Sequence, residues 1–337
     1  MGQPYFSVIL ATRNRPAEFG GAVNSVLAQS FRKLEIIVVN DGSDDEYQAQ
    51  YATVLEAVTG VSVRVVSLQR HRSGHGQSYA INSAVAEANA PYICFLDDDD
   101  YWTDPCHLER AAAVISSSSA DLYMANQAAY KADERLARPI WLEELGPILE
   151  RSGRHPEGDG SYTVSVGDLL KAQGFCHLNT LIVRRTLYER IGGMEETIRW
   201  SCDQDFYLRL IDGSSVMKFM PIVVSRHNVP DPARRSSMTT GLTEVERRLF
   251  QLAVFHRVQY LARHPAIRAH ARRQTAYTLK RIAEALAGDG RYVDAVSYGR
   301  EALGAGPTLK WAGYTAWLSC CALLRANRAG ISKDPGS

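Results

Sequence analysis

Apolar runs alternate with amphipathic segments over the N-terminal third of the chain. Four runs rich in β-branched side chains predict strands, at residues 5–11, 34–40, 61–68 and 91–96. The segments between these runs carry apolar residues at helical spacing, and Pro16 is suited to open the first helix. Because continuous apolar strands separated by helices are typical of sheets covered on both faces, the pattern favours a mainly parallel α/β sheet.

Weaker patterns extend this arrangement through the middle of the chain. Strand-like runs occupy residues 120–130, 179–184 and 216–225, and a helical pattern occupies residues 203–212. The segment at 131–163 is rich in Pro, Gly and charge, so we expect long loops there.

Beyond the last strand-like run, nearly all of the chain has helical periodicity. Glycine-containing breaks interrupt it at residues 288–290 and 304–307. We therefore place a domain boundary near Thr240. It separates an α/β domain over residues 1–240 from a helical C-terminal region over residues 241–330.

The composition is that of a folded globular protein. The chain has 337 residues, with 45% apolar and 22% charged residues. Its six cysteines form no C-x-x-C pair, so neither a zinc site nor a disulfide framework is indicated, and a reducing compartment fits best. The N-terminal residues show no secretory signal pattern, and we expect a cytoplasmic location.

The small net charge of +1 conceals a difference between the two regions. Residues 243–337 contain 15 Lys and Arg against 7 Asp and Glu, which is +8 and leaves −7 for residues 1–242. Nucleic-acid binding is not favoured, because the acidic part lacks a basic stripe interleaved with aromatic residues. The basic helical region is compatible with an anionic partner surface.

Polar clusters follow three of the predicted strands, at residues 12–15, 40–45 and 97–100. In parallel sheets ligands bind beyond the carboxyl ends of the strands, so we expect these clusters to form one site. Four consecutive acids, Asp97 to Asp100, repel one another unless a cation lies among them, and oxygen ligands suit Mg²⁺ or Mn²⁺. The alternative for the acidic run alone is a solvated turn.

Two further segments have features of nucleotide binding. Asp41, in NDGSDD after the second strand, could accept a hydrogen bond from a uracil base, although the same residues also suit a tight turn that caps a helix. Residues 69–78, with Arg72 and two glycines before a helix, combine the donors that favour phosphate groups.

As an ordered set, the segments SVILATRNR, IIVVNDGSDD, YICFLDDDDYW, RRTLYERIGGMEE, CDQDFYLRL and SRHN resemble the family 2 glycosyltransferases of the GT-A fold, over about residues 4–240. The resemblance implies that the nucleotide is contacted by Thr12 and Arg15 and that Asp41 reads the base. It also implies that Asp97 and Asp99 of a D-x-D motif hold ribose and metal, with Asp98 at the variable position of that motif.

The same resemblance places the catalytic base at Asp203, in CDQDFYLRL. The family usually has Glu-Asp at this point, so Cys202 departs from the pattern and puts the orientation and pKa of Asp203 in question. A helix N-terminus enriched in acids, including Asp205, is the alternative reading. His227 falls where the family often places a basic residue near the metal or the diphosphate, with Arg234 and Arg235 on the following loop; a surface loop is the alternative there.

These residues predict an inverting transferase that uses Mn²⁺ or Mg²⁺ and moves a sugar from a nucleotide-diphosphate donor, with a UDP-sugar as the first choice. The acceptor would be a hydroxyl group of a glycan or of a lipid-linked saccharide. One alternative is a sugar-phosphate nucleotidyltransferase, although TRNRPAE lacks the glycine expected after the first strand of that class. A non-catalytic sugar-nucleotide or partner-binding module is the other alternative.

The C-terminal region has a pattern of its own. Residues 283–307 have the small and aromatic spacing of one tetratricopeptide-like helix pair, which cannot bury its apolar face alone. The uncharged segment at 311–324 is too short for a comfortable membrane span. With the basic charge of the region, peripheral contact with the cytoplasmic face of a membrane is one hypothesis. Packing of the helices on one another or on the α/β domain is the other.

Overall fold

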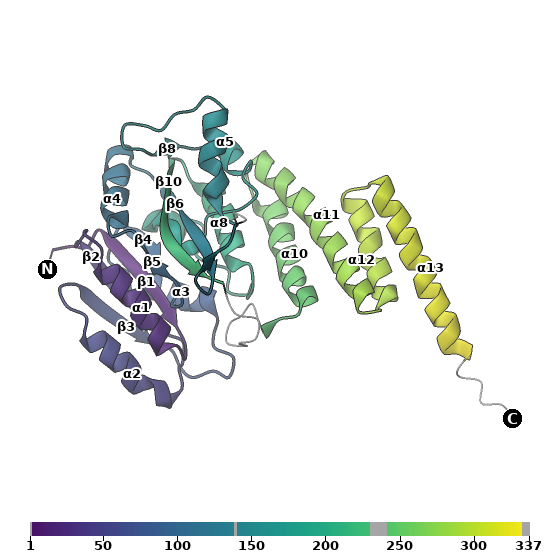
Figure 1. Ribbon diagram of the computed structural model, residues 1–337, viewed down its shortest axis with the longest axis horizontal. Coiled ribbons are helices and arrows are strands. Elements are labelled where there is room, and N and C mark those ends of the chain that lie inside the picture. The colour runs from purple at the N-terminus through teal and green to yellow at the C-terminus, as the bar shows by residue number, and fades with distance from the viewer. Residues whose placement is uncertain (1, 138–139, 230–240, 332–337) are drawn as a thin grey trace. The chain divides into compact units, whose positions relative to one another are not determined.

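The computed structural model describes residues 2–137, 140–229 and 241–331, and Figure 1 shows its elements. The chain divides into two compact units, residues 1–232 and residues 233–337. The predicted boundary near Thr240 lies outside the described residues, as do Arg234 and Arg235.

The N-terminal unit is built on one sheet whose first strands are parallel. These strands are β1 (Phe6–Thr12), β2 (Leu34–Asn40), β3 (Ser62–Ser67) and β4 (Tyr92–Phe95). Strand β1 pairs in parallel with both β2 and β4, and Thr12 lies opposite Asn40 at the end of the β1–β2 register. Strands β1, β2 and β4 are largely or fully buried, which agrees with their unbroken apolar runs.

The second half of the sheet is mixed. It comprises β5 (Tyr101–Trp102), β6 (Leu122–Lys131), β7 (Glu134–Arg135), β8 (Tyr162–Thr163), β9 (Leu181–Arg184) and β10 (Met217–Asn228). The main path of the sheet is β3-β2-β1-β4-β9-β6-β10-β5. Strand β9 is antiparallel to both of its neighbours, β4 and β6, whereas β10 is parallel to β6. The predicted α/β fold with a helical C-terminal region is confirmed, with antiparallel pairs added on one side of the sheet.

Helices pack around this sheet (Figure 1). They are α1 (Pro16–Leu27), α2 (Asp45–Glu56), α3 (Gln77–Ala86), α4 (His107–Ser118), α5 (Leu145–Arg151), α6 (Val166–Leu169), α7 (Arg185–Arg190) and α8 (Cys202–Gly213). Short 3₁₀ helices occupy Leu142–Glu144 and Leu178–Thr180. A core on one face of the sheet joins Val8 and Leu10 of β1 to Val23 and Val26 of α1. Burial of such side chains contributes roughly 1.5–3 kcal/mol each, which fixes the strands and therefore the positions of their ends.

The C-terminal unit is helical. It consists of α10 (Glu244–Leu261), α11 (Pro265–Gly288), α12 (Tyr292–Ala305) and α13 (Leu309–Ile331). Thr243 and Glu246 form a capping box that starts α10, and each helix packs on the next along the chain. The unit has its own apolar core, which includes Ile282, Trp311 and Leu318. Within the described part of the chain, no helix combines the length and apolar character that a membrane crossing requires.

Candidate functional site

The three polar clusters lie at one edge of the sheet, because β1 is the parallel neighbour of both β2 and β4. Residues Asp97 to Asp100 form the turn between β4 and β5. The hydroxyl group of Thr12, at the end of β1, donates a hydrogen bond of 2.7 Å to Asp98. The cluster that follows β2 is joined to the same edge through Asn14, whose side-chain amide donates to Asp44 at 3.0 Å. The sequence prediction of one shared edge therefore matches the geometry.

Arg15 supplies positive charge directly to the acidic turn. Its Nη1 atom lies 3.1 Å from Asp98 Oδ1 and 2.8 Å from Asp99 Oδ2. Burial alone would lower the pKa of Arg15, but the charges of Asp98 and Asp99 raise it overall. Part of the repulsion among the four acids is thus relieved by the chain itself.

Asp100 is held by protein groups on several sides and is 1% exposed. It accepts hydrogen bonds from the side chain of Asn179 at 2.6 Å and from the backbone N–H of Asn228 at 2.7 Å. The Nδ1 atom of His227 lies 2.7 Å from the same carboxylate. Burial works against protonation of His227, but the hydrogen bond and charge of Asp100 raise its pKa to about 9.

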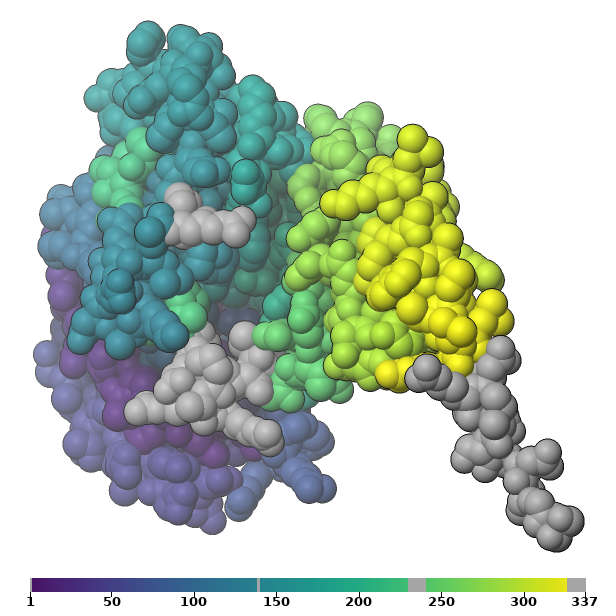
Figure 2. All heavy atoms as spheres, turned by 45° about the vertical axis from the view of Figure 1, so that its right-hand side comes forward, coloured from purple at the N-terminus to yellow at the C-terminus, as the bar shows by residue number. Residues whose placement is uncertain are grey.

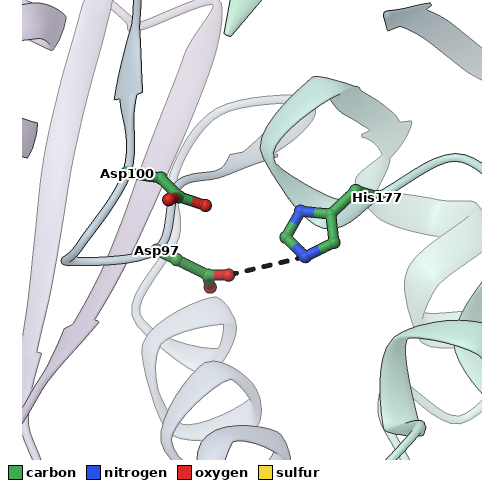
Figure 3. A group of neighbouring side chains, drawn as sticks. All are labelled: Asp97, Asp100 and His177. Carbon is green, nitrogen blue, oxygen red and sulfur yellow. Dashed lines mark ion pairs between the residues drawn. The ribbon is translucent and has the colours of Figure 1, made fainter. Parts of the chain in front are cut away.

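Asp97 faces a different neighbour. The Nε2 atom of His177 lies 3.7 Å from Asp97 Oδ2, and Gln77 donates to Oδ1 at 2.8 Å. Asp97, Asp100 and His177 together offer three ligand atoms that lie within 4.8 Å of one another (Figure 3). Burial lowers the pKa of His177 to about 3, so its imidazole is neutral and can act as a metal ligand.

This cluster fits a divalent cation. Burial raises the pKa of Asp97 well above its usual range, and the charges of Asp100 and Asp99 raise it further. Burial and the neighbouring negative charges both disfavour the ionised carboxylate, and a bound cation would offset both effects. Carboxylate oxygens together with an imidazole nitrogen are a donor set that Mn²⁺ and related ions accept.

The predicted metal ligands Asp97, Asp99 and His227 are brought to one place, but they face different partners. Asp97 belongs to the three-residue cluster, Asp99 pairs with Arg15, and His227 contacts Asp100. The rings of His227 and His177 have centroids 5.3 Å apart, so His227 borders the cluster.

Asp203 lies in the first turn of α8 and reaches the same site. Its Oδ2 atom is 4.0 Å from His177 Nε2, and its side chain keeps 21% exposure. Burial raises the pKa of Asp203 to about 6, although backbone N–H groups, including that of Gln204, lower it. A carboxylate with this pKa is ionised at neutral pH and can accept a proton.

The two neighbours of Asp203 have other surroundings. Cys202 is buried, with its Sγ atom 3.4 Å from Gln77 Oε1, and burial raises its thiol pKa to about 12. Asp205 is fully buried and pairs with Arg209 at 2.7 Å. Arg209 in turn donates to the carbonyl groups of Ile191 and Gly193. Asp205 therefore fixes α8 to the preceding loop, and Asp203 is the acid of the pair that faces the site.

Asp41 is enclosed by the loop that precedes α3. It accepts hydrogen bonds from the backbone N–H groups of His75 at 2.9 Å and Gly76 at 3.1 Å. A Cβ atom on Gly74, whose φ is +67°, would lie 2.6 Å from Asp41 Oδ2, so glycine is needed there. Arg72 is exposed on this loop, and its side chain makes no hydrogen bond or ion pair with any residue that the structure describes. The structure thus brings Asp41 to the sheet edge and leaves the Arg72 side chain apart.

The sequence patterns did not single out His177 or Asn179. Asn179 donates to Asp100 and also accepts from the backbone N–H of Asp97 at 2.9 Å, so it fixes both ends of the acidic turn. Both residues lie in or beside a short 3₁₀ helix, where no periodic pattern marks them. Their only signal is a pair of polar residues just before the apolar run of β9.

Comparisons with known proteins agree with this geometry. Residues 7–173 match the family described as glycosyl transferase family 2. An uncharacterised glycosyltransferase of Nostoc sp. is 33% identical over 112 residues, which are 33% of each chain. For the first three curated relatives, the match spans between 33% and 66% of their own length.

Two solved structures share the fold. Staphylococcus aureus TarS 1–349 in complex with UDP-GlcNAc has a TM-score of 0.63 and 18% identity, over 90% of this chain and 81% of that one. The Pyrobaculum calidifontis mannosyltransferase PcManGT in complex with GDP-Man and Mn²⁺ has a TM-score of 0.58 and 18% identity, over 98% of this chain and 84% of that one. The matched family and the shared fold agree with the arrangement at the sheet edge, and residues 7–173 form a glycosyl transferase family 2 domain.

Proposed function

We propose that this protein transfers a sugar from a nucleotide-diphosphate donor, with UDP-sugars as the first choice, to a hydroxyl group with inversion at the anomeric carbon. The observation that carries the proposal is that His177 lies 3.7 Å from Asp97 and 4.0 Å from Asp203. A cation site and a carboxylate able to accept a proton are therefore neighbours. The ligands named for the two structural neighbours, UDP-GlcNAc and GDP-Man, support a nucleotide-sugar donor.

The donor is proposed to lie across the carboxyl ends of β1, β2 and β4. Thr12, Arg15 and Asp41 would contact the nucleotide, and Arg72 is the predicted phosphate contact on the loop that precedes α3. Asp97 and Asp98, in the acidic turn, would contact the ribose of the donor. This orientation brings the diphosphate toward the acidic turn, which is favourable only with a cation between the two negative groups.

The divalent cation, Mn²⁺ or Mg²⁺, would be held by Asp97 and Asp100 with His177, and Asp99 and His227 border that position. When bound, it supplies Lewis-acid stabilisation of the negative charge on the departing diphosphate. Arg15, which contacts Asp98 and Asp99, partly balances the charge of those carboxylates and orients them. Asp97 is the one residue that belongs both to the ligands predicted from the sequence and to this three-residue cluster.

Asp203 is proposed as the general base. It would accept the proton of the acceptor hydroxyl while that oxygen bonds to the anomeric carbon. The bond between the anomeric carbon and the diphosphate oxygen breaks in the same step, and its electron pair leaves with the diphosphate. Positioned base catalysis of this kind contributes about 10²–10⁴-fold.

The direct test is Asp203→Asn, which keeps the size of the side chain and removes its basicity. Nucleotide release from a panel of nucleotide sugars would be measured with Mn²⁺ or Mg²⁺, and donor binding would be measured separately by calorimetry. We expect retained donor binding and a rate lowered about 10²–10⁴-fold. The exposed Asp45→Asn is the matched control, and an active Asp203→Asn enzyme would remove Asp203 from the base role.

The metal site has a test that separates the predicted ligands from the observed cluster. Asp99→Ala and His177→Ala would each be titrated with Mn²⁺ by calorimetry in the presence of UDP. Loss of Mn²⁺ binding in both variants is expected if the predicted ligand Asp99 and the cluster residue His177 hold the same ion. Unchanged Mn²⁺ dependence in Asp99→Ala would exclude that residue as a ligand.

Two alternative functions remain distinguishable by experiment. A nucleotidyltransferase would release pyrophosphate from a nucleoside triphosphate and a sugar 1-phosphate, and we expect none. A binding module would release no nucleotide with any acceptor. The proposed acceptor is a glycan or a lipid-linked saccharide. Contact of residues 241–330 with an anionic membrane surface would bring the enzyme close to lipid-linked acceptors.

A further inference from the structure

The C-terminal unit has a pocket between α11 and the turn that joins α12 to α13. Its volume is about 490 Å³. Small residues form much of its wall, among them Ala269, Ala276 and Gly306. A Cβ atom on Gly306 would lie 3.0 Å from the Cβ atom of Ala276, so glycine allows the turn to approach α11 closely. The outer surface of these helices is coloured light green to yellow in Figure 2.

Three cations line this pocket, and its lining includes no acid. Arg272 and Arg273 are exposed, and neither makes an ion pair or hydrogen bond with a residue in the described ranges. Lys280 is half-buried, and its Nζ atom lies 5.5 Å from the ring centroid of Trp311. By contrast Arg281, the next cation on α11, pairs with Glu284 at 2.7 Å. The positive charge of this unit is thus left uncompensated at the pocket.

Two exposed apolar side chains lie at the pocket or next to its lining. Tyr277 lines the pocket and is 54% exposed. Leu309 directly follows the lining residue Thr308 and is 94% exposed. A soluble anion gains nothing from an exposed leucine, whereas a lipid places apolar chains directly beside its phosphate group.

We propose that this pocket binds the phosphate headgroup of an anionic membrane lipid, with Tyr277 and Leu309 entering the apolar boundary of the bilayer beside it. The cations of the pocket lining favour an anionic ligand. The exposed side chains of Tyr277 and Leu309 favour a lipid over a soluble anion. This inference rests on the membrane contact proposed above and names the residues that would make it. It does not depend on the proposed donor, base or cation.

The test compares two double variants of the full chain that lose the same charge. Arg272→Gln with Arg273→Gln removes two pocket cations. Arg291→Gln with Arg300→Gln removes two cations of α12 and its N-terminus that do not line the pocket. Flotation would be measured with vesicles of phosphatidylcholine and phosphatidylglycerol in equal parts, and with vesicles of phosphatidylcholine alone. Circular dichroism would verify that each variant is folded.

The intact chain should float with the anionic vesicles and not with the neutral ones. A cation near an anionic surface contributes about fivefold to binding, so the pocket variant should bind roughly thirtyfold more weakly. The control variant should lose less than about threefold, because exposed charges away from the contact are screened by salt. Leu309→Ser should lower binding roughly tenfold, since it removes one apolar side chain from the boundary.

Three results would overturn the inference. An equal loss of vesicle binding in both double variants would mean that the basic unit is attracted to anionic membranes in general and that the pocket has no specific role. Failure of the intact chain to float would remove the membrane contact and the pocket together, while leaving nucleotide release as the separate test of the transferase. Saturable binding of inorganic pyrophosphate that is lost in Arg272→Gln with Arg273→Gln, without flotation, would assign the pocket to a soluble phosphate instead.

Discussion

Acidification is expected to destabilise the N-terminal unit through one buried histidine, His107. It starts α4, is 0% exposed, and has neither ring nitrogen hydrogen-bonded to a residue that the structure describes. Its ring packs against Trp102 and Tyr123, with centroids 5.1 and 6.1 Å away. Burial lowers the pKa of His107 from 6.5 to about 3, and Asp104 opposes this effect only in part. The folded protein therefore holds a neutral imidazole that becomes protonated on unfolding.

The magnitude follows from these two pKa values. Between pH 6.5 and pH 3 the unfolded chain binds a proton at His107 that the folded chain does not, so stability falls as the pH falls. At pH 5 the linkage relation gives a loss of about 2 kcal/mol relative to pH 8. Such a loss is a large part of a typical free energy of unfolding of about 5–15 kcal/mol.

The assay is urea denaturation at pH 8 and at pH 5, followed by tryptophan fluorescence and near-ultraviolet circular dichroism. The variant His107→Leu keeps a similar volume and cannot be protonated. Its loss of stability between the two pH values should be about 2 kcal/mol smaller than that of the unchanged protein. Protonation of His177, which is also buried, contributes to both proteins and cancels in this difference.

The exposed His155→Leu serves as the matched control and should leave the pH dependence unchanged. A His107→Leu variant that loses as much stability on acidification as the unchanged protein would refute the reasoning. It would mean that the imidazole is solvated, or finds a hydrogen-bond partner, in the folded state.

Three further changes test the contacts that support the site. Asp205→Ala removes the ion-pair partner of the partly buried Arg209 and should cost roughly 1.5–3 kcal/mol of unfolding free energy, measured with urea. Gly193→Ala should lower stability by about 1–3 kcal/mol in the same assay, because φ is +65° and the new Cβ atom would lie 2.7 Å from Asn82 Oδ1. Thr12→Val removes two side-chain hydrogen bonds of 2.7 and 2.8 Å and should cost roughly 1–3 kcal/mol, whereas Thr12→Ser should retain most of that stability.

Strands β1, β2 and β4 can be predicted because burial on both faces leaves an unbroken apolar run. The run at residues 34–40 is β2 with the same bounds, and the run at 5–11 is β1 shifted by one residue. Helix α5 lies inside the segment at 131–163 for which loops were expected. It has only seven residues, and the buried pair Leu145 and Leu149 is too short a repeat to indicate a helix.

The site is predictable where the topology alone determines it. Parallel neighbours end on the same edge, so Thr12 and Asp98 could be expected to lie close together, and a hydrogen bond joins them. His177 could not be expected, because it reaches Asp97 from an irregular segment some eighty residues further along the chain, through packing that no local pattern records.

The four acids at the end of β4 have four different surroundings, and these surroundings leave one place for a cation. Asp98 and Asp99 share Arg15, so their charge is already partly balanced. Asp100 is fixed by the side chain of Asn179 and the backbone of Asn228.

For both Asp97 and Asp100 the structure describes no ion pair with an Arg or Lys; Asp100 contacts His227, and the neighbour of Asp97 is the neutral imidazole of His177. Charge balance therefore favours a cation between Asp97, Asp100 and His177 rather than between Asp98 and Asp99. Because His177 also lies 4.0 Å from Asp203, a cation held there would lie near the proposed base. Positioning of the cation and orientation of the base thus depend on the same histidine, and His177→Ala should impair both.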